Sequence, residues 1–139
     1  MEKTFKLKIL APEKPVAELS VSQVQAPGVD GQMGILPGHA ALVSALRPGI
    51  LTVWQNGEQK PLHYYVGGGY LQFCRGEAVV LSEVIEVPEQ LDRERAEKAE
   101  KRAAERLART SDRAININRA LMALERARSR RKLLSLGKD

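Results

Sequence analysis

The spacing of apolar residues along the chain changes at Pro88. Before it, apolar and polar residues alternate, as in the Phe-Lys-Leu-Lys-Ile of residues 5–9, and this alternation predicts half-buried β-strands. After it, apolar residues recur at steps of three and four, which predicts amphipathic helices. The sequence therefore predicts an α+β chain: an antiparallel β-sandwich over residues 1–88, then an antiparallel two-helix hairpin over residues 89–139.

The first part has the pattern of short strands joined by frequent turns. A slip in the alternation after Val21 predicts a β-bulge. Asn56-Gly57 predicts a type I′ hairpin turn, which needs a positive φ at both positions, and Arg75-Gly76 predicts another turn. The strands expected around these turns are residues 50–54, 62–66, 70–74 and 78–84.

Alanine dominates the seam of the predicted hairpin. Asp92 is the expected N-cap, residues 110–112 the turn and Gly137 the stop. Because alanine buries little apolar area, we expect the hairpin to be marginally held and able to open or change partner. The seam residues are Ala96, Ala99, Ala103 and Leu107 in the first helix, and Ile117, Ala120, Leu121, Leu124 and Ala127 in the second.

Positive charge is concentrated in the last third of the chain. The net charge is +5, divided as −1 over residues 1–88 and +6 over residues 89–139. Such a segment suits nucleic acid, acidic lipid, an acidic protein surface or a nucleotide, or is an ordinary solvated helix face. It lacks interleaved aromatic residues for base stacking, which argues against nucleic acid. Without a signal-peptide pattern or an apolar run of about 18 residues, no direct membrane insertion is expected.

The residue types needed for catalysis or metal binding are not grouped in the sequence. His39 and His63 have no further ligands at metal spacing, so we expect no metal and a structural hydrogen-bonding role for His39. Cys74, the single cysteine, falls in a strand pattern and is expected to be small and buried rather than a nucleophile. Residues 67–69 are glycines followed by a predicted strand, which favours a bulge or close backbone approach over a phosphate loop. A stand-alone enzyme is therefore disfavoured.

A run rich in glycine and proline spans residues 26–49. It has the order A-P-G-V-D-G-Q-M-G-I-L-P-G-H-A-A-L-V-S-A-L-R-P-G. Its glycines and prolines predict a rigid non-helical segment, which is either a loop that offers backbone to a partner or a turn-rich sandwich edge with no partner. The run resembles the signature of bacterial ATP synthase ε subunits, the family called δ in mitochondria. V-G-G-G-Y-L at residues 66–71 and L-D-R-E-R-A at residues 91–96 resemble two further family motifs. The resemblance covers essentially the whole chain.

The resemblance implies a non-catalytic rotor subunit of a proton-translocating ATP synthase. Its sandwich would dock on the γ subunit above the proteolipid c-ring, at the cytoplasmic face of the bacterial inner membrane, and help couple rotation to ATP synthesis. Gln32 stands where members often carry an acidic residue. The implied docking residues are Gly28, Gly31, Gln32, Met33, Gly34, Pro37 and His39.

The resemblance also implies that the helices are regulatory. They would fold against the sandwich or extend along γ toward the catalytic α and β subunits, where they would block ATP hydrolysis. The basic residues expected to meet acidic surfaces there are Arg126, Arg128, Arg130, Arg131 and Lys132.

No cofactor is required by this resemblance, but some bacterial members bind regulatory ATP on the folded hairpin. With a turn near Ser111, we expect Arg95 to lie opposite residue 127, so that Arg95, Arg126 and Arg130 converge. The alternative is that nearby glutamates neutralise these arginines as ordinary surface pairs. The residues that match the ATP site are Glu86, Leu91, Asp92, Arg95, Arg102, Arg126 and Arg130.

Overall fold

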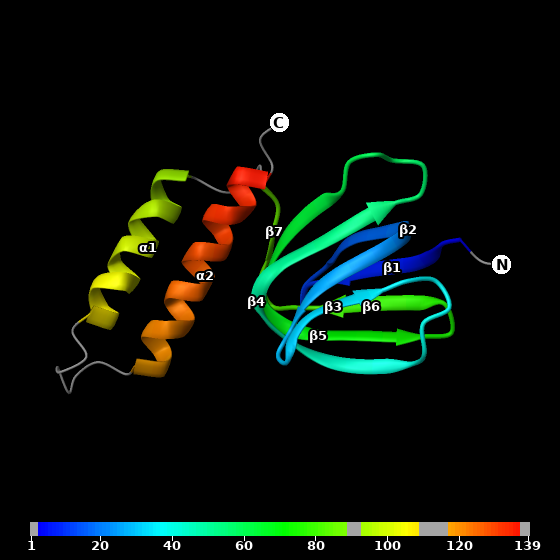
Figure 1. Cartoon of the computed structure of the whole chain (residues 1–139), viewed down its shortest axis with the longest axis horizontal. Coiled ribbons are helices and arrows are strands. Elements are labelled where there is room, and N and C mark those ends of the chain that lie inside the picture. Colours follow the sequence, from blue (N-terminus) through cyan, green and yellow to red (C-terminus); the bar gives the residue numbers. More distant parts are fainter. Residues whose placement is uncertain (1–2, 89–92, 109–116, 137–139) are drawn as a thin grey trace.

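The computed structural model has a β-barrel followed by two helices, and it describes residues 3–88, 93–108 and 117–136 (Figure 1). This arrangement confirms the predicted α+β class. The strands are β1 (Phe5–Leu10), β2 (Pro15–Gly28), β3 (Gly31–Ile35), β4 (Leu42–Gln55), β5 (Leu62–Cys74), β6 (Glu77–Leu81) and β7 (Ile85–Glu86), and the helices are α1 (Arg93–Ala108) and α2 (Ile117–Leu136).

The strands form one sheet that closes on itself. Its order is β1-β6-β5-β4-β2-β3, and β1 also pairs with β2 while β7 pairs with β5. The expectation of wholly antiparallel pairing is wrong at one place, because β1 and β6 run parallel. The closed ring contains β1, β2, β4, β5 and β6, and an odd number of strands cannot alternate in direction all the way round. Closure pairs each of these five strands on both sides, which reduces the strand edge open to pairing with other chains.

The barrel core follows the predicted alternation. Leu7 and Ile9 in β1 are fully buried, as are Leu51 and Val53 in β4. The register shift between Val21 and Gln23 confirms the predicted bulge. Cys74, however, is exposed, because it follows the inward-facing Phe73 and side chains alternate between the two faces of a strand; the expectation of a buried cysteine is wrong.

The two predicted turns differ in type from one another. Arg75 and Gly76 have φ of 53° and 74°, the paired positive values of a type I′ turn. At Asn56-Gly57 that prediction is wrong, because only Gly57 has a positive φ. The Asn56 amide donates to the Ser20 carbonyl of β2 at 3.4 Å, and the Glu58 amide closes the turn on the Gln55 carbonyl at 3.2 Å. A turn with one positive φ at its third residue is of type II.

Three glycines bring β5 close to its neighbours. They lie inside one continuous strand rather than between two strands, which corrects the predicted break; β6 also ends at Leu81 and not at residue 84. A Cβ on Gly67 would lie 2.9 Å from the Val84 Cβ, and one on Gly69, whose φ is +120°, would overlap the Leu81 carbonyl. The predicted close backbone approach is therefore confirmed.

The helices are antiparallel, with α2 between α1 and the barrel (Figure 1). Leu121 is 43% exposed although it was expected in the seam, whereas Leu133 and Leu134 are buried and were not predicted. The reason is that α2 packs on two sides, against α1 and against β4 and β5. Asp92, residues 110–112, the Ile117 side chain and Gly137 lie outside what the structure describes. The buried seam residues are Ala96, Ala103, Ala120, Leu124 and Ala127.

Candidate functional site

A charged contact ties α2 to the barrel. Both Nε and Nη2 of Arg130 donate to Glu86 Oε1, at 3.1 and 2.8 Å. The guanidinium carbon of Arg130 also lies 5.0 Å from the centre of the Tyr65 ring, within the range of a cation–π interaction. A second pair joins Arg47 of β4 to Glu125 of α2 at 3.0 Å. These contacts hold the hairpin in its folded position on the barrel.

Tyr65 is an unusual member of this contact. Its side chain is fully buried, and its hydroxyl has no hydrogen-bond partner among the described residues. Burial raises the pKa of Tyr65 to about 12, although Arg130 and Arg126 oppose the rise. The buried hydroxyl therefore costs stability even when neutral, because it has left water without gaining a partner.

We expect Tyr65→Phe to raise the free energy of unfolding by about 1 kcal/mol at neutral pH. The folded chain keeps the Tyr65 proton between pH 10.0 and about 12, where an unfolded tyrosine loses it, so the stability of the wild type should fall across that interval. Urea unfolding at several pH values measures both effects, with the exposed Tyr70→Phe as the matched control. Equal alkaline slopes for wild type and Tyr65→Phe would contradict this account.

Four arginines surround a small hollow between the helices. Arg102 and Arg106 of α1 face Arg126 and Arg130 of α2 around a space of about 250 Å³. Clustered guanidinium groups repel one another unless an anion or carboxylate lies between them. The hollow therefore suits a phosphate chain, and Glu86 already neutralises Arg130. The floor of the hollow is Ala99, Ala103, Ala123 and Ala127.

The expected convergence of Arg95 with Arg126 and Arg130 is wrong. Ala103, not Arg95, shares the hollow with Ala127, a difference of about two helical turns. Arg95 instead lines a separate surface hollow formed by α1 residues alone. The cause is the longer interval between the helices, since α1 ends at Ala108 and α2 begins at Ile117.

Three more residues bear on the candidate nucleotide site. Sequence reasoning missed Arg106, although its place four residues after Arg102 puts both on one helix face. Leu91 and Asp92 lie outside the described residues.

The glycine- and proline-rich run forms a β-hairpin followed by a turn, rather than one irregular loop. In β2 and β3, Gly28 pairs with Gly31 and Pro27 with Gln32, while Met33 and Gly34 continue the ladder. His39 Nδ1 lies 2.8 Å from the Ala40 carbonyl oxygen, and the His39 amide donates to the Leu36 carbonyl at 3.1 Å. These contacts fit the predicted structural role of His39. Pro37 is half-buried beside it.

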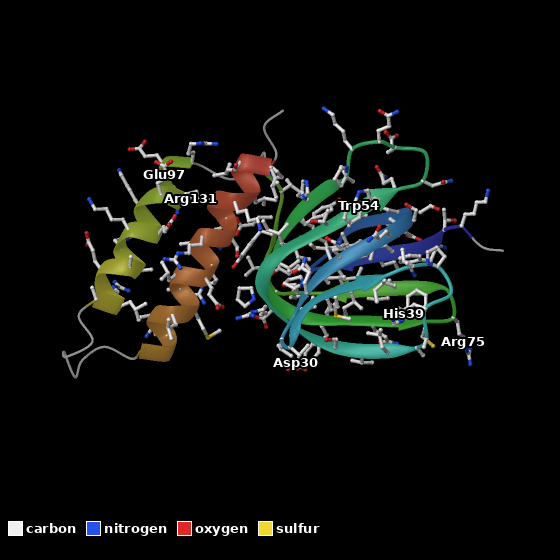
Figure 2. The ribbon with its side chains drawn as sticks, in the orientation of Figure 1. Asp30, His39, Trp54, Arg75, Glu97 and Arg131 are labelled. Carbon is white, nitrogen blue, oxygen red and sulfur yellow. The ribbon has the colours of Figure 1, made fainter. Side chains whose placement is uncertain are left out.

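The docking residues expected from the sequence do not form a single cluster. Figure 2 shows Asp30, at the tip of the β2–β3 hairpin, nearer the helices and His39 toward the far end of the barrel. The run therefore presents a hairpin tip and a separate turn.

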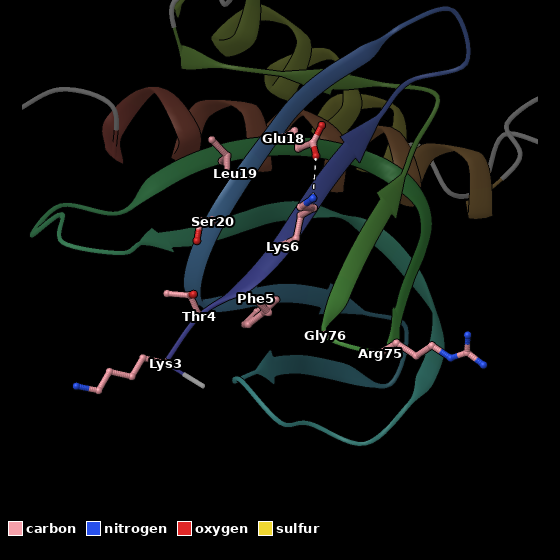
Figure 3. A pocket seen from close by; sticks show the side chains of 9 residues that line it. All are labelled: Lys3, Thr4, Phe5, Lys6, Glu18, Leu19, Ser20, Arg75 and Gly76. Carbon is pink, nitrogen blue, oxygen red and sulfur yellow. Dashed lines mark ion pairs between the residues drawn. The ribbon is translucent and has the colours of Figure 1, made fainter. Parts of the chain in front are cut away.

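A wider hollow of about 580 Å³ lies at the start of β1 (Figure 3). Lys6 and Glu18 line it with their charged atoms 3.5 Å apart, and Lys3 and Arg75 line it as well. This mixed lining does not favour one class of ligand.

Comparison with known proteins identifies the family. The family model described as "ATP synthase, Delta/Epsilon chain, beta-sandwich domain" matches residues 4–88. The ATP synthase epsilon chain of Desulforamulus reducens is 42% identical over 130 residues, which cover 94% of this chain and 96% of that one. The chain belongs to the ATP synthase δ/ε family. The epsilon chain of Bacillus velezensis is 36% identical, over 92% of this chain and 95% of that relative.

The fold is also that of solved members of ATP synthases. A chain in the mitochondrial ATP synthase of Euglena gracilis, determined with OSCP, F1 and the c-ring, superposes with a TM-score of 0.81 over 93% of this chain and 80% of that one, at 24% identity. This δ/ε chain is thus similar to a subunit of a multi-subunit complex. Within the described residues, neither helix is apolar and long enough to cross a bilayer, and no group of three or more His, Cys, Asp or Glu side chains could hold a metal ion.

Proposed function

We propose that the chain is a central-stalk subunit that helps couple proton-driven rotation to ATP synthesis and restrains ATP hydrolysis through its helices. The observation that carries this proposal is the 42% sequence identity to an epsilon chain over 94% of this chain, a length that includes the helices. The barrel docks on γ and the c-ring at the cytoplasmic face of the membrane. The helices alternate between the folded position and one extended toward the catalytic α and β subunits. The chain itself carries out no catalysis.

An exposed apolar strip on the barrel supports docking on γ. Tyr70 in β5 is 59% exposed and pairs with Leu81 in β6, which is 48% exposed. Val43 in β4 is 70% exposed and lies on the adjoining strand. Neighbouring exposed apolar side chains of this size commonly mark an interaction site. We call Val43, Tyr70 and Leu81 the Tyr70 strip and assign it to γ.

Tyr70→Glu should weaken binding of the chain to a purified γ subunit about tenfold or more, since a charge would be buried against an apolar partner. Val16→Glu, on β2 and 37% exposed, is the matched control and should bind like wild type. Surface plasmon resonance measures both affinities. If the two variants bind γ equally well, the Tyr70 strip is not the docking surface.

Regulatory ATP is proposed to bind the arginine hollow and so stabilise the folded hairpin. A ligand at ten times its dissociation constant adds roughly 1.4 kcal/mol to the state that it binds, which shifts a marginal equilibrium about tenfold. Arg102, Arg126 and Arg130 hold the phosphates in this proposal, with Arg106 added by the structure.

Arg126→Ala should weaken ATP binding about tenfold or more, because it removes a charge-assisted contact. Titration calorimetry on the isolated chain measures this, with Arg119→Ala, on α2 but outside the hollow lining, as the control. If the wild type shows neither heat nor a thermal shift with millimolar ATP, the arginines do not form a nucleotide site.

A further inference from the structure

Three basic residues of α2 are held by two carboxylates of the same chain. Glu86 accepts both hydrogen bonds from Arg130. Glu100 of α1 lies 2.9 Å from Arg131 Nε and 3.9 Å from Arg128 Nε. Arg128, Arg130 and Arg131 are among the residues proposed to meet acidic partner surfaces, so the folded hairpin engages them internally.

These two carboxylates are more enclosed than an ordinary surface pair. The side chains of Glu86 and Glu100 are 22% and 18% exposed, whereas that of Glu94, paired with Lys98 on α1, is 75% exposed. Attraction between partly enclosed charges is less screened by water and salt. Glu100 Oε2 is within ion-pair distance of Arg131 but has no aligned hydrogen bond, so this contact is mainly one of charge.

The surroundings of Arg130 also help to hold it beside Glu86. Its guanidinium carbon lies over the Tyr65 ring, 5.0 Å from the ring centre, and its side chain is only 31% exposed. An outside carboxylate would have to displace Glu86 and also draw Arg130 away from the ring. The pair of Arg47 with Glu125 keeps the same stretch of α2 against β4.

We propose that Glu86 and Glu100 are built-in competitors for the acidic surface that α2 would otherwise bind. They imitate that surface within the chain, and α2 becomes available only when its arginines leave them. This inference rests on the proposed inhibitory function and specifies its regulation. It predicts opposite effects for the two charge types: loss of the arginines weakens binding to acidic partners, whereas loss of these two glutamates strengthens it.

The test uses the full-length chain and a short poly-glutamate peptide as the acidic probe, at low salt. Glu86→Gln/Glu100→Gln is compared with Glu94→Gln/Glu105→Gln, which has the same net charge and alters exposed residues of α1. Fluorescence anisotropy should show about threefold to tenfold tighter peptide binding for the first variant. Equal affinities of the two double variants would overturn the inference.

Two further experiments separate the role of Glu100 from the role of the barrel contact and from the proposed inhibitory function. Glu100→Gln alone leaves the contact of Arg130 with the barrel intact and should still bind the peptide more tightly than Glu94→Gln. Loss of the contact between α2 and the barrel therefore cannot account for the tighter binding, and equal affinities of these two single variants would show that Glu100 is not a competitor.

In the second experiment, the full-length chains are returned to an ATP synthase complex that lacks this subunit, where the Glu86→Gln/Glu100→Gln chain should inhibit hydrolysis at lower concentration than its control. If even the wild-type chain fails to inhibit, the proposed function is wrong, while the peptide comparison still decides the inference.

Discussion

Removal of residues 89–139 should raise the ATP hydrolysis rate of the assembled complex several-fold. If the extended helices block about nine in ten complexes, their loss gives about a tenfold increase, and if they block half, about twofold. The fragment ends at Pro88, after the last strand, β7, which ends at Glu86. We expect the fragment to stay folded because it keeps strands β1 to β7. We expect it to assemble normally because it keeps the Tyr70 strip.

The control for this experiment is a full-length chain in which Arg128, Arg131 and Lys132 are replaced by glutamine. It keeps the helices but removes part of the charge proposed to contact the catalytic subunits, so it should reproduce part of the increase. Incorporation is measured by the amount of chain per complex, and folding of the fragment by circular dichroism. Unchanged hydrolysis at equal incorporation would contradict an inhibitory role for the helices.

Gly69→Ala should destabilise the barrel by about 3 kcal/mol or more, a large part of the stability of a small domain. Gly69 has a φ of +120°, and a Cβ there would overlap the Leu81 carbonyl of β6. Relief of that overlap requires β5 and β6 to separate at the Tyr70 and Leu81 pair. Urea unfolding followed by circular dichroism measures the loss.

Gly57→Ala is the matched control for this substitution. Gly57 also has a positive φ, of +82°, but nothing lies within 4 Å of its added Cβ. It should cost about 1 kcal/mol, from backbone strain alone. If Gly69→Ala loses no more stability than Gly57→Ala, the close approach of β5 and β6 does not matter for folding.

Local patterns predicted the strands well but could not predict how they close. The alternation in β1 and β4 identified the buried faces because one side of each strand meets the core. The parallel pairing of β1 with β6 depends on the number of strands in the ring, which no single segment contains. Cys74 was placed incorrectly because its strand pattern did not fix which face it occupies.

The helix contacts were harder to predict, for a related reason. The pairing of two antiparallel helices depends on where the chain reverses, and an error of a few residues there moved Arg95 by about two turns. The pair of Glu86 with Arg130 joins residues 44 positions apart. The family resemblance selected Arg130 for a nucleotide, and Glu86 was added for its place just before the hairpin, but only the folded arrangement reveals that they bind each other.

We propose that this chain works as part of the stalk of an ATP synthase. The most direct test is affinity purification of the full-length chain from the membranes of its own cells, followed by subunit identification and quantification. We expect the wild-type chain to recover γ, the c-ring and the catalytic α and β subunits. The Tyr70→Glu chain should recover less of these subunits. Recovery of the wild-type chain without γ and the catalytic subunits would contradict it.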